Sequence, residues 1–308
     1  METTTVIQFM ERFVAALREE GRDGTAHVYA CTLKQLKLFC GDRPVPFAEV
    51  NTRFLKQFEE HMLHLQLSWN SVSTYMRMFR AVYNRATDEG LTDYTPRMFR
   101  TVYTGVKSPV KRAIPPQVWR AILQSRRRLP AALEFTRAIF ALLFLLRGIP
   151  FVDLVFLRRC DLVDNVITYR RRKTGTRITV VVEPEAMALI RRHASRNRKT
   201  PFLFPFIKEP GCDEYAQYQR ALRIFNHRLQ QLADTLNLDP DIRISTYSAR
   251  HSWATIANFQ QYGQELISNA MGHSSVRVTE TYFKAFDEEQ IASMNRGVIA
   301  AVMGANKR

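Results

Sequence analysis

Three short segments decide which fold this chain adopts: STYSARHSWAT (Ser245–Thr255), MGHSS (Met271–Ser275) and TETYF (Thr279–Phe283). Arg250 opens a predicted helix, Gly272 and His273 form a predicted turn, and Tyr282 follows the histidine by nine residues. Taken singly, each side chain has an ordinary structural explanation: an arginine of a basic protein, a histidine that caps a helix, or a half-buried aromatic ring. Their order and spacing call for a joint explanation.

This spacing closely resembles the second conserved box of the tyrosine recombinase (phage integrase) family. In that family the box arginine, the histidine of the glycine-histidine turn and a tyrosine nucleophile surround one scissile phosphate of DNA. The resemblance therefore implies that Arg250, His273 and Tyr282 are catalytic, with His273 binding the phosphate or transferring a proton. It covers most of the chain, because the family also has a helical DNA-clamping domain, a linker and a mixed catalytic domain in this order.

These residue types suit phosphoryl transfer. The negative charge of a phosphodiester grows in the transition state, so guanidinium groups that bind its non-bridging oxygens stabilise that state more than the ground state. A tyrosine has a reference pKa of about 10, and nearby arginine and histidine cations favour its phenolate. Attack by Tyr282 leaves a 3′-phosphotyrosyl bond and a 5′-hydroxyl, which conserves the bond energy for religation. We therefore expect no metal, ATP or other cofactor, and no small-molecule substrate.

Two positions depart from the family pattern. Tyr247 stands three residues before the box arginine, where the family usually has histidine. Its hydroxyl can donate a hydrogen bond to a phosphate oxygen but is a poorer general base near neutrality, and core packing is the alternative.

In the first box, Pro150 stands where an arginine belongs, three residues before Asp153, and we expect Arg147, one helical turn earlier, to reach the same phosphate. Asp153 is expected to orient an arginine through a buried ion pair or to cap its helix.

A predicted β-hairpin supplies further cations. The β-branched segments 166–169 and 178–182 flank the sequence KTGT, in which Gly175 favours a turn. Lys173 matches the lysine that the family carries on a β-turn inserted into the minor groove, where an ammonium group can protonate the leaving 5′-oxygen. Three preceding residues are predicted phosphate contacts, with solvated strand positions as the alternative: Arg170, Arg171 and Arg172.

Outward from this site, the sequence predicts a mainly α protein with a small β-sheet, of the α+β class. Apolar residues recur at helical spacing in the first part of the chain, which predicts a four-helix domain over residues 1–103. The resemblance makes it a SAM-like core-binding domain. Residues 104–116 hold one glycine, three prolines and three cations, the composition of an interdomain linker. Residues 117–308 form the predicted mixed α/β catalytic domain with a carboxyl-terminal tail.

The charge distribution indicates a polyanionic partner. The formal net charge is +16, and residues 108–308 contribute most of it, with 31 Lys or Arg against 17 Asp or Glu. This excess favours nucleic acid, since each neutralised phosphate releases condensed counterions, although charge alone does not separate DNA from RNA. Arg77 and Arg80 of the fourth predicted helix are expected to contact DNA or to be solvated surface.

The sequence favours the cytoplasm, and the resemblance implies a bacterial protein associated with the nucleoid. The longest apolar run, residues 138–146, is well below the ~20 residues of a membrane span. The first residues lack the basic start and apolar core of a signal peptide. The four cysteines form no C-x-x-C pair and have no histidine cluster near them, so no metal site is expected.

The resemblance implies a site-specific DNA recombinase, an integrase, invertase or small mobile-element enzyme, that binds inverted-repeat core sites in double-stranded DNA. It also implies a homotetramer on two DNA sites that exchanges carboxyl-terminal tails, although the tail can instead pack on its own domain. Because residue 6 already begins the first predicted helix, we expect a compact two-domain type without an arm-binding domain. Two alternatives stay open: a DNA-binding member that has lost strand exchange, and a type IB topoisomerase-like enzyme.

Overall fold

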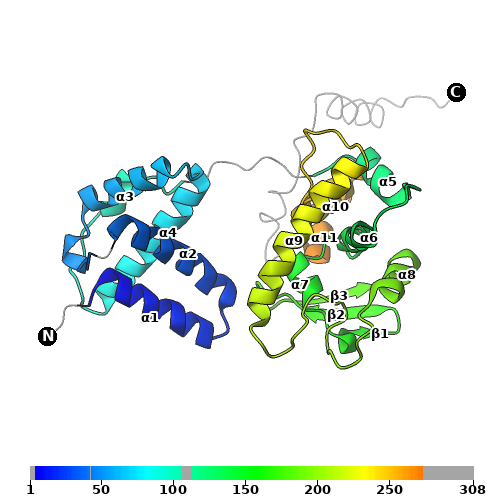
Figure 1. Ribbon diagram of the computed structural model, residues 1–308, viewed down its shortest axis with the longest axis horizontal. Helices are drawn as coiled ribbons and strands as arrows, with labels where there is room; N and C mark the ends of the chain where they lie inside the picture. The colour runs from blue at the N-terminus through cyan, green and yellow to red at the C-terminus, as the bar shows by residue number, and fades with distance from the viewer. Residues whose placement is uncertain (1–3, 42, 106–112, 273–308) are drawn as a thin grey trace, which may run out of the picture. The chain divides into compact units, whose positions relative to one another are not determined.

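The computed structural model describes residues 4–41, 43–105 and 113–272. The chain divides into two compact units, Met1–Pro109 and Val110–Arg308, and each has its own hydrophobic core. Figure 1 shows helices α1 to α4 in the first unit and the sheet with the other labelled helices in the second. Each unit thus buries the apolar surface that an independent domain requires.

The first unit is a bundle of four helices. Its elements are α1 Val6–Glu19, α2 Asp23–Cys40, η1 Phe47–Glu49, α3 Thr52–His64, α4 Trp69–Asp88 and η2 Met98–Thr101, where η marks a short 3-10 helix. Thr5 caps α1, because its side chain accepts a hydrogen bond from the amide of Gln8 (3.3 Å) and its amide donates to the Gln8 side chain (3.0 Å). Phe58 and Phe79 are completely buried where the apolar faces meet. The four predicted helices are confirmed, and Gly90 follows the end of α4 with φ +74°.

The second unit joins helices to one small antiparallel sheet. Within the described residues its elements are α5 Pro116–Gln124, α6 Ala131–Leu145, α7 Phe151–Val155, η3 Arg159–Asp161, β1 Leu162–Val163, β2 Val166–Arg170, β3 Arg177–Val181, α8 Pro184–His193, α9 Glu214–Thr235, α10 Thr246–Phe259 and α11 Gln264–Met271. The strands lie in the order β1-β2-β3, with Thr168 opposite Thr179 and Arg170 opposite Arg177. The predicted class, mainly α with a small β-sheet, is confirmed.

The predicted hairpin is formed by β2 and β3. The amide of Arg171 donates to the carbonyl of Thr176 (2.9 Å), and the carbonyl of Arg171 accepts from the amide of Gly175 (2.7 Å). Gly175 has φ +70°, a conformation that glycine adopts without steric cost. Lys173 therefore lies in a tight turn that extends beyond the paired strands.

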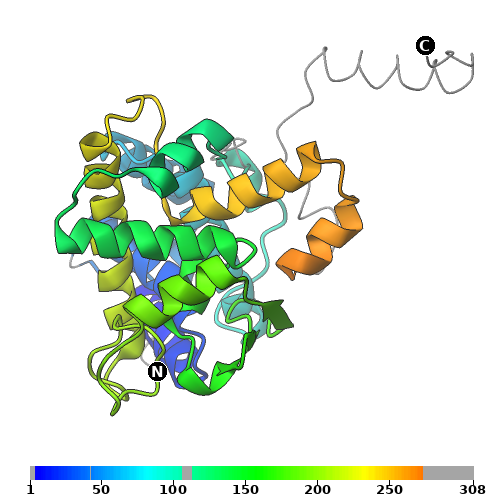
Figure 2. The same ribbon diagram turned by 90° about the vertical axis from the view of Figure 1, so that its right-hand side faces the viewer.

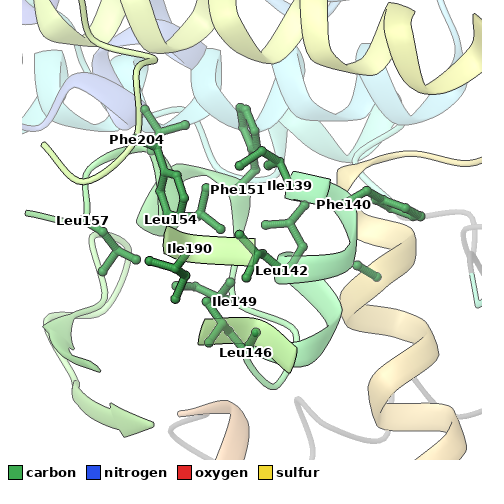
Figure 3. Packing of buried hydrophobic residues seen from close by; sticks show 14 of the residues in the cluster. Ile139, Phe140, Leu142, Leu146, Ile149, Phe151, Leu154, Leu157, Ile190 and Phe204 are labelled. Atoms are coloured by element: carbon green, nitrogen blue, oxygen red, sulfur yellow. The ribbon is translucent and has the colours of Figure 1, made fainter. Parts of the chain in front are cut away.

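Helix α6 is the centre of the second unit. It contacts α8, α9 and α10, and Figures 1 and 2 show it among these helices. Ile139, Phe140 and Leu142 of α6 are completely buried, and Figure 3 shows them grouped with apolar side chains of the following segments. The indole of Trp119 on α5 stacks on Phe140, with 4.7 Å between ring centroids. This core holds α10 and the segment after α6 in fixed relation to each other.

Helix α7 is shorter than the sequence predicts. Its apolar pattern favours a helix over residues 150–158, but α7 ends at Val155. Beyond this point the carbonyl of Leu157 accepts a hydrogen bond from the amide of Leu203 (2.7 Å), and Arg158 joins the same segment in an isolated β-bridge. This pairing with a distant part of the chain draws the backbone out of the helix, and local periodicity holds no information about it.

The end of the predicted linker packs on the second unit. Ile114 is buried, and its amide donates a hydrogen bond to Oγ of Ser252 on α10 (2.9 Å). Pro116 then begins α5, at the first helical position where its missing N–H is not needed. The division into a first domain of residues 1–103, a linker of residues 104–116 and a catalytic domain of residues 117–308 stays a prediction.

None of the described helices has both the length and the apolar character needed to cross a bilayer. Within residues 4–41, 43–105 and 113–272, no three His, Cys, Asp or Glu side chains gather in a group that could hold a metal ion. The four cysteines are free thiols, of which Cys160 and Cys212 are exposed.

Candidate active site

Arg250 lies at the centre of the candidate site. At the start of α10, the amide of Ser245 donates to Oγ of Ser248 (3.0 Å), which satisfies a backbone donor at the beginning of the helix. The Arg250 side chain is buried, with 3% of the residue exposed. Its Nη1 donates to the carbonyl of Gly148 (2.7 Å) and its Nη2 to the carbonyl of Met271 (2.9 Å). Arg250 therefore joins α10 to the turn after α6 and to the end of α11.

The turn after α6 fits closely against Arg250. Arg147 and Gly148 both have positive φ, +58° and +69°. A Cβ atom at Gly148 would lie 2.9 Å from the Cα atom of Arg250, so only glycine allows the two backbones to approach this closely. Arg147 is half-buried, and its Nη1 donates to the carbonyl of Thr179 on β3 (3.4 Å). The expected substitute for the first-box arginine is thus one residue away from the carbonyl that Arg250 holds, and its phosphate contact stays a prediction.

Asp153 on α7 and Arg171 after β2 form a buried ion pair in the same region. Oδ2 of Asp153 lies 3.7 Å from Nε of Arg171, and Oδ1 accepts a hydrogen bond from the amide of Arg172 (2.9 Å). Nη1 of Arg171 donates to the carbonyl of Gly272 (2.9 Å). Burial raises the pKa of Asp153, whereas a backbone hydrogen bond and the charges of three nearby arginines lower it. A carboxylate, a guanidinium and a carbonyl thus connect α7, the hairpin and the end of α11.

Tyr169 on β2 belongs to this cluster, although the sequence analysis does not single it out. Burial raises the pKa of Tyr169, and the charge of Asp153 raises it further. The charges of Arg250, Arg171 and Arg147 act in the opposite direction. The phenol therefore shares the electrostatic environment of the site. A tyrosine on a half-buried strand is common, so no sequence signal distinguishes this one.

The hairpin turn carries the predicted DNA-binding cations in two different environments. Lys173 and Arg170 are exposed, and Arg170 Nη1 donates to a carbonyl of the turn (3.3 Å). Arg172 is also exposed and stacks its guanidinium on the ring of Phe156, with Cζ 3.8 Å from the ring centroid. Arg171 instead points inward to Asp153 and the end of α11. DNA contact by these residues stays a prediction.

Tyr247 lies at the start of α10 and is 47% exposed. Its ring centroid is 6.3 Å from that of His251, one turn further along the helix. Because the ring is not buried, the alternative of core packing does not apply, and its role in the site stays a prediction. His273 and Tyr282 lie outside the described residues, which end at Gly272 with φ +65°.

The predicted DNA contacts of the first unit lie on α4. Arg77 is half-buried, and its Nε donates to a carbonyl one turn earlier in the helix (3.4 Å). Arg80 is exposed and lines a cavity of about 340 Å³. Arg97 and Arg100 line the same cavity, so three guanidinium side chains gather at this end of the unit. Such a cluster suits a phosphate backbone, and the contact stays a prediction.

Two family descriptions match this chain. "Phage integrase SAM-like domain" matches residues 5–101, which contain the four-helix bundle, and "Phage integrase family" matches residues 115–289. The second match by itself covers more than half of the chain. No curated protein sequence matches it.

Solved integrase structures share the fold over nearly the whole chain. The Tn1549 transposon integrase in complex with transposon right end DNA has a TM-score of 0.63 at 17% identity, covering 95% of this chain and 99% of that one. A lambda integrase dimer bound to a core site has a TM-score of 0.67 at 16% identity, covering 92% and 99%. A lambda integrase tetramer bound to a Holliday junction has a TM-score of 0.65 at 16% identity, covering 93% and 80%. At this level of identity the likeness establishes the fold.

Proposed function

Because this chain belongs to the phage integrase family, whose members are tyrosine recombinases, we propose that it is a site-specific DNA recombinase. It cleaves one strand of duplex DNA with Tyr282 and rejoins that strand to a different partner. The position of Arg250 carries the proposal. This arginine of the family box is buried where α10 meets the turn after α6 and Met271, two residues before His273.

In the proposed reaction the hydroxyl of Tyr282 attacks the scissile phosphorus. Its proton passes to neutral His273, a bond forms between the phenol oxygen and phosphorus, and the bond from phosphorus to the 5′-oxygen breaks. Lys173 gives a proton to the leaving 5′-oxygen, because an ammonium group releases a proton where a guanidinium does not. The products are a 3′-phosphotyrosyl bond and a 5′-hydroxyl. Attack by the 5′-hydroxyl of another strand reverses these steps and completes the exchange.

Three further side chains act on the phosphate in this proposal. Arg250 supplies a permanent positive charge from a buried position, where it is less screened than it would be in water. Arg147 replaces the arginine missing from the first box, which its location beside Gly148 supports. Tyr247 donates a hydrogen bond to a phosphate oxygen, and the exposure of its ring supports that role.

DNA binding and assembly form a second part of the proposal. Cations of both units contact the backbone of inverted-repeat core sites: the exposed Arg170 and Arg172 of the hairpin and Arg80 of α4, with the half-buried Arg77 of α4. Four copies act on two sites and exchange their carboxyl-terminal tails, as a bacterial invertase or mobile-element integrase associated with the nucleoid. The net charge of +16 supports a nucleic-acid partner. The relatives of similar fold include a dimer and a tetramer of lambda integrase bound to DNA.

The test is a covalent protein–DNA adduct. Duplexes that the full chain binds are selected from a random library and nicked at successive positions, so that a short 5′-hydroxyl fragment can diffuse away after cleavage. We expect the wild type to accumulate an adduct that resists denaturation and Tyr282→Phe to form none. Tyr262→Phe, at a tyrosine that is 54% exposed on the second unit, is the matched control and retains the adduct.

Two outcomes would overturn the proposal. Tight binding to a selected duplex without any adduct would identify a DNA-binding relative that has lost strand exchange, to which Pro150 and Tyr247 point. Relaxation of any supercoiled plasmid, with adducts that show no sequence preference, would identify a type IB topoisomerase-like enzyme.

A further inference from the structure

Arg171 differs from its neighbours in the hairpin by being buried. It is 8% exposed, whereas Arg170 and Arg172 on either side are exposed. Its Nη1 donates a hydrogen bond to the carbonyl of Gly272 (2.9 Å), and its Nε lies at ion-pair distance (3.7 Å) from Oδ2 of Asp153. A buried guanidinium is tolerated only when it is paired and hydrogen-bonded, and both conditions are met here.

Both carboxylate oxygens of Asp153 on α7 interact with the hairpin segment. Oδ1 of Asp153 accepts from the amide of Arg172 (2.9 Å), and Oδ2 faces Arg171. The backbone of Arg171 is itself fixed by its hydrogen bonds to Thr176 and Gly175 in the turn. The Arg171 side chain therefore starts from a rigid base, which limits where its guanidinium can reach.

Two arginines hold two consecutive carbonyls at the end of α11. Arg250 holds the carbonyl of Met271 and Arg171 that of Gly272. Gly272 has φ +65°, and a Cβ atom there would lie 2.1 Å from Cδ1 of Ile178 and 3.2 Å from Cδ of Arg171. The backbone is thus pressed against β3 and Arg171 at the last residue before His273.

We propose that Arg171 is a positioning residue for strand cleavage, not a DNA contact. By fixing the Gly272 carbonyl to Asp153, it sets the direction in which the chain continues to His273 and Tyr282. The effect on cleavage rests on the proposed recombinase function. The effect on the end of α11 does not, so the two can be tested apart.

The first test needs no DNA. Amide hydrogen exchange is followed for residues 269–272 in the wild type, in Arg171→Gln and in Arg170→Gln, the matched control on the adjacent exposed residue. Loss of a buried hydrogen bond from a charged donor is expected to speed exchange in Arg171→Gln about tenfold or more. Arg170→Gln is expected to match the wild type. Equal exchange in all three proteins would refute the positioning role, whether or not the chain cleaves DNA.

The second test separates positioning from phosphate binding. With the nicked duplex, Arg171→Gln is expected to slow adduct formation at saturating DNA about 100-fold, as a small misplacement of reacting groups does. Its dissociation constant and its salt dependence are expected to match the wild type. Arg170→Gln, at a proposed phosphate contact, should instead lower the slope of log affinity against log salt by about 1.

The opposite pattern would overturn the inference: a lower salt slope in Arg171→Gln with an unchanged cleavage rate. Arg171→Lys keeps the charge beside Asp153 but lacks the forked donor geometry, so it should cleave at a rate between those of the wild type and Arg171→Gln. It is also the variant to compare if Arg171→Gln does not fold. Full activity of Arg171→Lys would show that charge alone matters and would contradict a positioning role for the forked contact with the Gly272 carbonyl. An absence of adduct in the wild type would count against the recombinase function and leave the exchange result to decide the role of Arg171.

Discussion

At the residue scale, each of two buried arginines in this site packs against a glycine. Gly148 lies against the backbone of Arg250, and Gly272 lies against Arg171. Both glycines have positive φ, and each has its carbonyl bonded to the arginine beside it. The missing Cβ atom creates the space, and the left-handed backbone turns the carbonyl toward the guanidinium. Each guanidinium thus depends on the glycine turn for a hydrogen-bond acceptor.

Gly148→Ala should cost more stability than the same change at Gly175. Both glycines have φ near +70°, so alanine pays a conformational penalty of about 1 kcal/mol or more at either position. At Gly148 the new Cβ atom would also lie 2.9 Å from Arg250 Cα, whereas at Gly175 nothing lies within 4 Å. We expect Gly148→Ala to lower the free energy of unfolding by about 1–3 kcal/mol more in urea titrations. Equal decreases in the free energy of unfolding would show that the turn at Gly148 adjusts to the added Cβ atom without further destabilisation.

Asp153→Asn tests the electrostatics of the ion pair. Burial raises the pKa of Asp153 in the folded chain, so its contribution to stability is fully present below the unfolded pKa of about 3.9 and is lost as the pH rises through the folded value. Asparagine does not titrate and can still accept from the amide of Arg172. The free energy of unfolding of the wild type, relative to Asp153→Asn, should therefore fall as the pH rises from about 4 toward neutrality. A relative stability that rises instead would show that the arginines outweigh burial.

The sequence alone predicts which residues belong to this site better than it predicts where their side chains point. The box spacing singles out Arg250, and Asp153 is expected to pair with an arginine. That partner, Arg171, is predicted to face DNA like the arginines on either side of it. In an irregular turn neighbouring side chains do not alternate between two faces, so the pattern cannot show which of three cations turns inward. The contact with Gly272 joins residues 101 positions apart, which no local rule reaches.

Among the elements, α6 contributes most to the core of the second unit that Figure 3 shows. Residues 138–145 of this helix are all apolar, as the buried part of a helix that contacts α8, α9 and α10 requires. Its bounds and those of α8 follow from local signals: apolar runs, and prolines at or just before their first residues. The end of α7 and the two-residue strand β1 do not, because both depend on backbone pairing with other segments.

Leu142→Ala should destabilise the second unit by about 2–5 kcal/mol, since it removes a completely buried side chain and leaves a cavity. Leu123→Ala on α5 is the matched control, because Leu123 is 40% exposed and its truncation should cost no more than about 0.5 kcal/mol. Thermal unfolding of both variants, followed by circular dichroism, provides the comparison. A small effect at Leu142 would mean that the core around α6 closes over the missing atoms.

For the whole molecule, the sequence predicts two compact parts and an uneven charge. Composition marks the linker, since glycine and proline interrupt helical periodicity there. The net charge of +16 belongs mainly to residues 108–308. These features belong to the chain as a whole and do not depend on the orientation of any one side chain, which is why they could be read without a structure.

The affinity of the full chain for duplex DNA should depend steeply on salt. A protein that neutralises about 6–10 phosphates loses about 10³–10⁵ in affinity between about 50 and 200 mM salt. We expect a loss in this range for a selected duplex, measured by fluorescence anisotropy with the wild type. Replacement of Arg80 and Arg170 together should lower the slope by about 2. A slope near zero would contradict a phosphate-dominated interface.

The close approach at Gly148 has a consequence for tracing this protein among genomes. The closest atom to a Cβ at position 148 would be the Cα atom of residue 250, which every amino acid has, so the steric demand for glycine does not depend on the arginine side chain. In decaying gene copies, selection to fold would preserve the glycine after selection to cut DNA had ceased to preserve the arginine. A descendant with glycine at position 148 and a neutral residue at position 250 would then identify a lineage that retained the fold and lost DNA cleavage.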